Sequence, residues 1–274
     1  MTGWEDAPPP PFQITPLGWL RVLWRGALLG AFIYGGLVVL LLVRLAEWPL
    51  YGQARPVTPR ITMFVCRTAL RILRLPLTVH GTPMTKPGAI VANHSSWLDI
   101  FVLNAVQTVY FVAKAEVADW PLIGWLARAT GTVFIARKGT ESKKQQQVFE
   151  SRLMAGHRLL FFPEGTSTDA TRVLPFKSTL FQAFFAPALV RTMHIQPVTV
   201  VFHAPAGEDS RHYGWWGDMD FASHLLKTLA TPRQGRVEVT FHPEVPVDAF
   251  ENRKLLAQHC ERVIRTVHVH SAAS

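Results

Sequence analysis

The stretch AIVANHSSWLD, residues 89–99, joins a short apolar run to a polar loop and the start of a helix. Ala89 to Ala92 is apolar throughout, which is typical of a strand buried on both faces. The Ser96-x-x-Asp99 spacing that comes next can cap the N-terminus of a helix. A buried strand that leads through a loop into a helix is the repeating unit of α/β folds.

Further apolar runs occur along the chain, separated by stretches that suit helices: residues 109–113, 133–136, 159–162 and 195–202. This alternation predicts an α/β fold with a mainly parallel sheet flanked by helices. A late strand is expected at residues 236–242, where it would close the edge of the sheet, and a terminal helix is expected at 248–269.

The composition indicates a folded protein that works at a membrane. Of the 274 residues, 49% are hydrophobic and only 17% are charged. This excludes a disordered chain and favours a membrane-associated protein over a fully soluble one. The formal net charge of +9 indicates an anionic partner surface, and the apolar content favours lipid over nucleic acid. The two cysteines, Cys66 and Cys260, exclude a disulfide framework.

Residues 1–75 are expected to form an N-terminal membrane-associated helical segment. Gly26 to Val43 is a run of eighteen uncharged residues, about the length needed to cross a bilayer as a helix. The run predicts an uncleaved anchor, either spanning or monotopic, and the alternative is a buried core helix. Six arginines and one acid, Glu47, come after the run and before residue 76. The positive-inside rule therefore predicts that the rest of the chain faces the cytoplasm.

A second helix is expected at residues 61–75. Arg67, Arg71 and Arg74 are spaced by four and three residues, which places their guanidinium groups on one helical face. Such a helix can lie in the membrane interface with its arginines on lipid phosphates. The alternative is an ordinary amphipathic helix with a solvated charged face.

Polar motifs come directly after three of the predicted strands. Asn93 to Asp99 follows AIVA, Arg137 follows TVFIA, and Pro163 to Thr166 follows LLFF. Because ligands bind at the carboxyl ends of strands in open α/β sheets, we expect these motifs to converge on one cleft.

His94 and Asp99 are the candidate catalytic pair. Asp99 in the first helical turn can accept the imidazole N–H of His94, which leaves the other ring nitrogen to take a proton from a hydroxyl. The sequence has no Gly-x-Ser-x-Gly elbow, so the pair suits activation of a hydroxyl on the substrate. The alternative is that Asp99 is only a helix cap.

Four blocks in this order resemble the glycerolipid acyltransferase family, the lysophosphatidic acid acyltransferase-like enzymes: NHSSWLD at 93–99, GTVFIAR at 131–137, FPEGT at 162–166 and IQPV at 195–198. The resemblance implies that His94 and Asp99 form the catalytic dyad and that residues 76–274 form the acyltransferase domain. The substrate-binding residues expected from it are Asn93, Gly131, Arg137, Phe162, Pro163, Glu164, Gly165, Thr166 and Ser167.

Ser167 departs from the pattern of the phosphate-acceptor enzymes, which usually have arginine at this position of the third block. Loss of that guanidinium removes a charge-assisted contact worth about 1.5 to 3 kcal/mol to a phosphate. Residues 162–181 and the later YGWWGDMDFASHL are similar to the lyso-ornithine lipid acyltransferase branch, whose acceptor head group is an amino acid. The head-group carboxylate is then expected at Arg137 and its amine at Glu164. Lysophosphatidic acid is the alternative acceptor.

These observations predict a membrane-bound O-acyltransferase that moves a fatty acyl group from a thioester to a lysolipid. The donor is expected to be acyl-acyl carrier protein or acyl-coenzyme A, with no metal or other cofactor, since no motif for one is present. The carrier could meet basic residues near the cleft, namely Lys114, Lys138, Lys143 and Lys144. The expected location is the cytoplasmic membrane, with the catalytic domain in the cytoplasm and no nucleic-acid partner. The non-enzymatic alternative is a membrane-surface lipid-binding protein.

Overall fold

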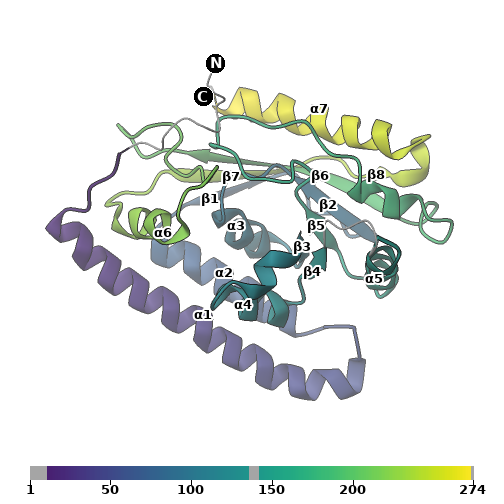
Figure 1. Cartoon of the computed structure of the whole chain (residues 1–274), viewed down its shortest axis with the longest axis horizontal. Coiled ribbons are helices and arrows are strands. Elements are labelled where there is room, and N and C mark those ends of the chain that lie inside the picture. Colours follow the sequence, from purple (N-terminus) through teal and green to yellow (C-terminus); the bar gives the residue numbers. More distant parts are fainter. Residues whose placement is uncertain (1–10, 136–141, 273–274) are drawn as a thin grey trace.

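The computed structural model describes residues 11–135 and 142–272 and contains a central, mostly parallel sheet (Figure 1). The strands lie in the order β1 (Leu77–His80), β7 (Arg236–Phe241), β6 (His194–His203), β2 (Gly88–Ala92), β5 (Leu159–Phe161), β3 (Tyr110–Lys114) and β4 (Val133–Ile135), and β8 (Val245–Pro246) pairs with β6. Strands β2 to β6 run parallel to one another, whereas β7 is antiparallel to β6. The predicted fold class is confirmed.

The edge of the sheet differs from the prediction. Strand β7 lies between β6 and β1, so residues 236–242 do not close the sheet. The edge strand is β1, which was not predicted because Leu77 to His80 alternate apolar and polar residues over only four positions, and such a short run cannot be told from a loop.

Helices cover both faces of the sheet and create two cores. On one face lie α1 (Pro16–Tyr51), α2 (Thr58–Leu73), α3 (Leu98–Val106) and α6 (Phe221–Ala230), and on the other lie α5 (Ser142–Met154) and α7 (Arg253–Ala272) (Figure 1). The short α4 (Ile123–Thr130) packs near α1 and α2. Strand β2 sends Ile90 and Ala92 into one core and Ala89 and Val91 into the other. It is therefore buried on both faces, as its apolar sequence predicts.

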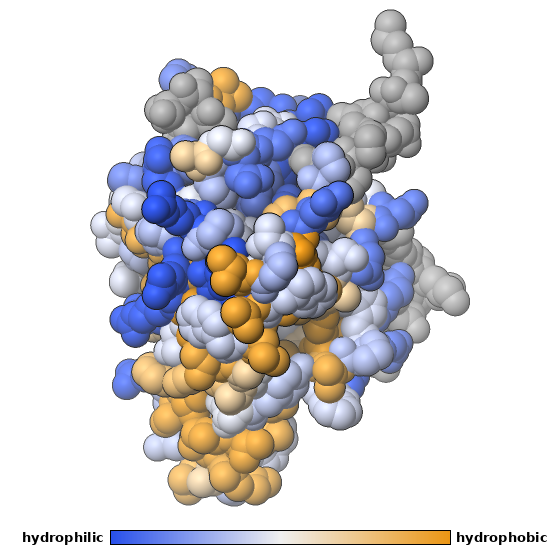
Figure 2. All heavy atoms as spheres, turned by 90° about the vertical axis from the view of Figure 1, so that its left-hand side faces the viewer, coloured by the Kyte–Doolittle hydropathy of each residue, from blue (hydrophilic) through white to orange (hydrophobic). Residues whose placement is uncertain are grey.

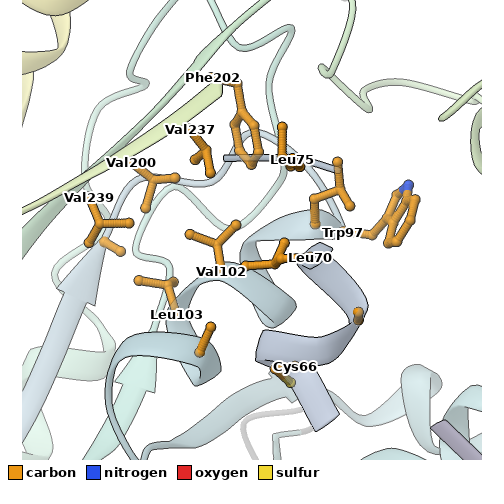
Figure 3. Packing of buried hydrophobic residues seen from close by; sticks show 14 of the residues in the cluster. Cys66, Leu70, Leu75, Trp97, Val102, Leu103, Val200, Phe202, Val237 and Val239 are labelled. Atoms are coloured by element: carbon orange, nitrogen blue, oxygen red, sulfur yellow. The ribbon is translucent and has the colours of Figure 1, made fainter. Parts of the chain in front are cut away.

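Helix α2 is part of the core beneath the sheet. Figure 3 shows Cys66 and Leu70 of α2 in the same cluster as Trp97, Val200 and Val237. The helix ends at Leu73, and Arg74 caps it in the left-handed conformation, with φ of 58°. The division of the chain into residues 1–75 and 76–274 stays a prediction, and α2 does share its core with the later part.

Helix α1 is longer than the apolar run that predicted it and is fastened to the body near both ends. Arg25 is buried and donates to the carbonyls of Leu229 (2.9 Å) and Thr231 (2.7 Å). These groups lie at the end of α6, where carbonyls lack intrahelical donors. Towards the other end of α1, the Glu47 carboxylate accepts from the backbone N–H of Val57 (2.7 Å) and from the hydroxyl of Thr58 (2.8 Å).

The outward side of α1 is a large apolar surface. Within the described residues, α1 is the one helix long and apolar enough to cross a membrane. Leu23, Leu42 and Leu45 are 72%, 61% and 74% exposed on it. Figure 2 shows hydrophobic residues gathered on the lower part of the molecule, where Figure 1 places α1. An apolar surface of this extent indicates membrane association.

Candidate active site

The loop from β2 to α3 brings His94 and Asp99 together. The Nδ1 atom of His94 lies 2.7 Å from Oδ2 of Asp99. The same carboxylate oxygen accepts the backbone N–H groups of Ser95 (2.8 Å) and Ser96 (3.0 Å). Asp99 is completely buried, whereas the His94 side chain is 19% exposed. A carboxylate in this position can only accept from the ring, so the proton lies on Nδ1 and Nε2 is left as a base.

The two interpretations of Asp99 are compatible in this geometry. Its carboxylate organises the loop before α3 by accepting two backbone N–H groups, and with the same oxygen it orients His94. A structural role for Asp99 is therefore compatible with the catalytic role predicted for it.

The third polar motif, Pro163 to Thr166, and the residues next to it hold His94 from the side of β5. The ring of Phe162 stacks on the His94 imidazole, with centroids 4.1 Å apart and planes 10° apart. The N–H of Thr168 donates to the carbonyl of His94 at 3.0 Å. These contacts restrict both the ring and the backbone of His94, which keeps the base in one orientation.

Glu164 connects the two motifs and is 1% exposed. Its Oε1 accepts the N–H of His94 (2.7 Å), and its Oε2 accepts the N–H of Leu174 (2.6 Å). Burial raises the pKa of this carboxyl to about 8, and the charge of Asp99 acts in the same direction, while the two N–H groups oppose the rise. Both oxygens accept backbone N–H groups, so Glu164 positions His94, and its contact with a head-group amine stays a prediction.

Asn93 and Ser167 also make internal contacts. The side-chain amide of Asn93 donates to the carbonyl of Val200 and accepts from its N–H, both at 2.8 Å, which continues the pairing of β2 with β6. The hydroxyl of Ser167 donates to the carbonyl of Trp215, and the N–H of Trp215 donates to the carbonyl of Ser95 at 3.0 Å. Ser167 therefore ties down the Trp215 loop, and its place in the head-group site stays a prediction.

Gly131 lies far from the dyad. It caps α4 in the left-handed conformation at φ of 85° and precedes β4, so it is at the opposite end of the parallel strands from His94. A Cβ at this position would lie 3.1 Å from atoms of Arg55 and Arg152. The left-handed conformation explains the glycine without a ligand. Arg137, the partner of Gly131 in the predicted acceptor site, lies outside the described residues.

The predicted carrier-binding lysines are only partly described. Lys138 and the side chains of Lys143 and Lys144 lie outside the described part of the chain, and Lys114 is exposed at the end of β3.

Lys177 is a further candidate site residue, which no sequence pattern indicated. Its N–H donates to the carbonyl of Pro163 at 2.9 Å, and its Nζ lies 2.8 Å from the place a Cβ on Gly165 would occupy. Gly165 has a φ of 75°, so the turn requires glycine for its conformation, whereas the flexible lysine side chain could move away from a Cβ. A lone lysine beyond the motif carries no sequence signal, but the turn brings its charge to the third block.

The described residues include no group of three or more His, Cys, Asp or Glu side chains placed to hold a metal ion. The arrangement around His94 can remove a proton from a hydroxyl that is placed next to Nε2. This is the chemistry of an enzyme that activates its substrate's own oxygen as the nucleophile.

Comparison with known proteins identifies the family. A family model described as Acyltransferase matches residues 76–201. The lyso-ornithine lipid O-acyltransferase of Rhodobacter capsulatus is 56% identical over 261 residues, which cover 95% of each chain. The 1-acyl-sn-glycerol-3-phosphate acyltransferase of Neisseria gonorrhoeae is 36% identical over 76% of this chain and 80% of its own.

The fold matches a solved structure. The crystal structure of the 1-acyl-sn-glycerophosphate (LPA) acyltransferase of Thermotoga maritima aligns with a TM-score of 0.65 at 20% identity, covering 94% of this chain and 97% of that one. The chain belongs to the acyltransferase family, and the predicted family resemblance is confirmed. It is an O-acyltransferase, as the sequence analysis predicted.

Proposed function

We propose that the enzyme transfers a fatty acyl group from a thioester to the hydroxyl of lyso-ornithine lipid. The observation that carries the mechanism is the 2.7 Å contact between His94 Nδ1 and Asp99 Oδ2. His94 Nε2 takes the hydroxyl proton as the lysolipid oxygen attacks the thioester carbonyl. The carbon–sulfur bond then breaks, and the imidazolium returns its proton to the leaving thiolate. Asp99 stabilises the imidazolium between the two proton transfers.

Backbone amides of the third motif are the candidate donors to the oxyanion that forms on the thioester carbonyl. The N–H of Gly165 already donates to the carbonyl of Phe162 at 3.1 Å, where it closes the turn. The next two amides, those of Thr166 and Ser167, are therefore the better candidates. The acyl donor, acyl-acyl carrier protein or acyl-coenzyme A, is the one cosubstrate of this mechanism, which uses no metal or other cofactor.

Two observations support an amino-acid head group over a phosphate. The relative with 56% identity carries the lyso-ornithine name, and the arginine usual in the phosphate-acceptor enzymes is replaced by Ser167. The head-group carboxylate would meet Lys177 beside Gly165, together with Arg137 as the sequence analysis expected. Lysophosphatidic acid remains the second candidate, because a relative with 36% identity is named for that activity.

Wild-type enzyme is expected to prefer lyso-ornithine lipid when it competes with lysophosphatidic acid for one acyl donor. Lys177→Gln is expected to raise the KM for lyso-ornithine lipid about tenfold or more with a smaller change in kcat, because a charge-assisted hydrogen bond contributes about 1.5 to 3 kcal/mol. Lys177→Arg should retain binding, and Lys254→Gln on α7 is the matched control for loss of one charge. A clear wild-type preference for lysophosphatidic acid would replace the proposed acceptor, whereas an unchanged KM in Lys177→Gln would exclude only the lysine contact.

We further propose that α1 lies in the cytoplasmic leaflet as a monotopic anchor. Its contacts with α2, α6 and α4 extend along the body, and Arg25 and Glu47 fasten it near both ends. A helix held in this way cannot cross the bilayer while the body stays outside. The arginines that come after the apolar run support a cytoplasmic catalytic domain.

Polar substitutions on the outward side of α1 are expected to release the enzyme from membranes. Replacing Leu23, Leu42 and Leu45 by glutamine should lower vesicle binding by tenfold or more, because burial of each leucine contributes about 1.5 to 3 kcal/mol. Flotation of purified protein with phosphatidylcholine vesicles containing phosphatidylglycerol measures the effect. Leu255→Gln with Val269→Gln on α7 is the control, and equal release by that pair would contradict the assignment.

A further inference from the structure

A groove that the proposed reaction does not use lies between α2, the end of α3 and the edge strand β1. Its volume is about 650 Å³, within the range of ligand sites. Much of its lining is apolar: Leu70, Leu75, Pro76, Leu77, Val79, Ala105 and Val106. Neither His94 nor any residue of the third motif lines it, so it is separate from the candidate active site.

Three arginines of α2 and its cap complete the lining of this groove, which we call the α2–β1 groove. Arg67 donates from Nε to the carbonyl of Ala105 at 2.6 Å, which fixes its guanidinium against the end of α3. Arg71 and Arg74 are exposed. In the described part of the chain no carboxylate lines the groove, and Arg25 of α1 lies close enough to Arg74 for their charges to repel. The groove therefore favours an anion.

Helix-end electrostatics explain only part of this arrangement. Arg71 lies in the last turn of α2 and Arg74 at its cap, where positive charge stabilises the negative end of the helix dipole. That effect requires no cavity. An apolar groove beside clustered arginines fits a ligand that has both an acyl chain and an anionic head.

The position of the groove favours a membrane lipid as that ligand. Helix α2 packs along α1, whose outward side is the apolar surface assigned to the membrane. In Figure 2 hydrophilic residues lie directly above that apolar surface, at the level expected for lipid head groups. The arginines of α2 can therefore meet phosphates while the apolar lining receives hydrocarbon.

We propose that the α2–β1 groove binds one anionic phospholipid of the bilayer, with its phosphate at Arg71 and Arg74 and one acyl chain along Leu70, Leu77 and Val79. The site would give the enzyme a specific contact with anionic lipid in addition to the nonspecific apolar contact of α1.

The test is native mass spectrometry of the full chain, purified in detergent and titrated with phosphatidylglycerol. The wild type is expected to show a saturable adduct of one lipid per chain, with phosphatidylcholine bound much more weakly. Arg71→Gln with Arg74→Asn should reduce the adduct about tenfold or more, since each charge near a phosphate contributes roughly a factor of five. Asparagine is chosen at residue 74 because it tolerates the left-handed backbone there.

A second variant distinguishes lipid binding inside the groove from a general attraction between the arginines and anionic lipid. Val79→Trp fills the groove at a position that is 42% exposed and leaves the net charge unchanged. It is expected to abolish the one-lipid adduct while flotation with anionic vesicles stays near the wild-type value. Arg253→Gln with Lys254→Gln on α7 removes the same charge from another surface and should leave the adduct intact. Thermal unfolding confirms that each variant is folded.

Several outcomes would overturn the proposal. They are a full adduct in Val79→Trp, equal loss in the α7 control pair, and multiple lipids bound without saturation. The Arg71→Gln/Arg74→Asn variant could instead lose binding to acidic acyl carrier protein and keep the phosphatidylglycerol adduct. That result would assign the arginines to the carrier. The adduct is measured without acceptor or acyl donor, so its result is independent of the proposed acceptor. Acyl transfer to lyso-ornithine lipid dispersed in neutral detergent should be retained in Val79→Trp.

Discussion

Replacing His94 by alanine is expected to reduce acyl transfer by about 10²- to 10⁴-fold, because general-base assistance to the attacking hydroxyl is lost. The Nε2 atom is the reacting atom in this mechanism, and Asp99 fixes its direction through the 2.7 Å contact with Nδ1. The measurement is turnover of an acyl thioester with lyso-ornithine lipid by purified enzyme in detergent. The decrease should appear in kcat, since the base acts during the chemical step.

His80→Ala is a suitable control for this substitution, since His80 lies on the edge strand with its side chain 53% exposed. It should leave turnover unchanged. His94→Ala should still fold and bind vesicles, because the backbone contacts of residue 94 with Glu164 and Thr168 do not involve the imidazole. Near-normal turnover in folded His94→Ala would exclude the dyad mechanism and leave the family assignment intact.

The second large effect is expected at acid pH, where the folded state should lose several kcal/mol of stability. Burial lowers the pKa of His157, His224 and His268 to about 4 and that of His212 to about 3. In the unfolded chain these groups titrate near 6.5, so the unfolded state binds more protons as the pH falls. Each contributes up to about 1.4 kcal/mol per pH unit between 6.5 and its folded pKa. All four shifts act in the same direction, so together they favour unfolding as the pH falls.

Glu164 has the opposite effect on the pH dependence of folding stability. Its pKa is raised to about 8 in the folded state, so its contribution to stability is present below about 4.5 and is lost as the pH rises through 8. One carboxyl cannot offset four histidines between pH 6.5 and 4.5, and the net slope favours unfolding by acid.

His268→Leu tests this explanation at one residue. His268 of α7 is 1% exposed, and its two buried ring nitrogens have no hydrogen-bond partner among the residues that the structure describes. Burial lowers its pKa most, Asp169 raises it and Arg265 lowers it. At pH 4.5 the leucine variant is expected to be more stable than the wild type by about 2 to 3 kcal/mol. At pH 7.5 the charge-dependent part of this difference disappears.

The measurement is urea unfolding in detergent at the two pH values. His270→Leu is the matched control, since His270 lies two residues later in α7 and is exposed. It should change neither midpoint. If His268→Leu and His270→Leu give the same difference between pH 7.5 and 4.5, burial of His268 is not the cause of acid unfolding.

Short-range patterns account for the parts of the fold that the sequence predicted correctly and for the contact between His94 and Asp99. The apolar run Ala89 to Ala92 predicts a buried strand because a strand between two layers needs apolar side chains on both faces. The pairing of His94 with Asp99 is equally local, since a single loop and the first turn of α3 bring the two side chains together. The four blocks indicate the family for the same reason, because each is a run of four to seven adjacent residues.

The roles of other residues depend on long-range contacts, which the sequence alone could not predict. Arg25 is the charged boundary of the apolar run in the sequence, but its partners are carbonyl groups of α6 and its cap that lie more than 200 residues later. Glu164 is predicted to contact the substrate, but its two carboxyl oxygens accept the backbone N–H groups of His94 and Leu174.

By itself, the sequence determined the fold class, the family and the candidate dyad, because these depend on periodicity and on spacings of a few residues. Only the tertiary structure decided which polar groups of the candidate site are taken up by internal hydrogen bonds. The physical reason is that a buried polar group must find a hydrogen-bond partner, and the sheet and its helices supply that partner from distant parts of the chain. The roles of Asn93, Glu164 and Lys177 depend on those partners, which no local pattern encodes.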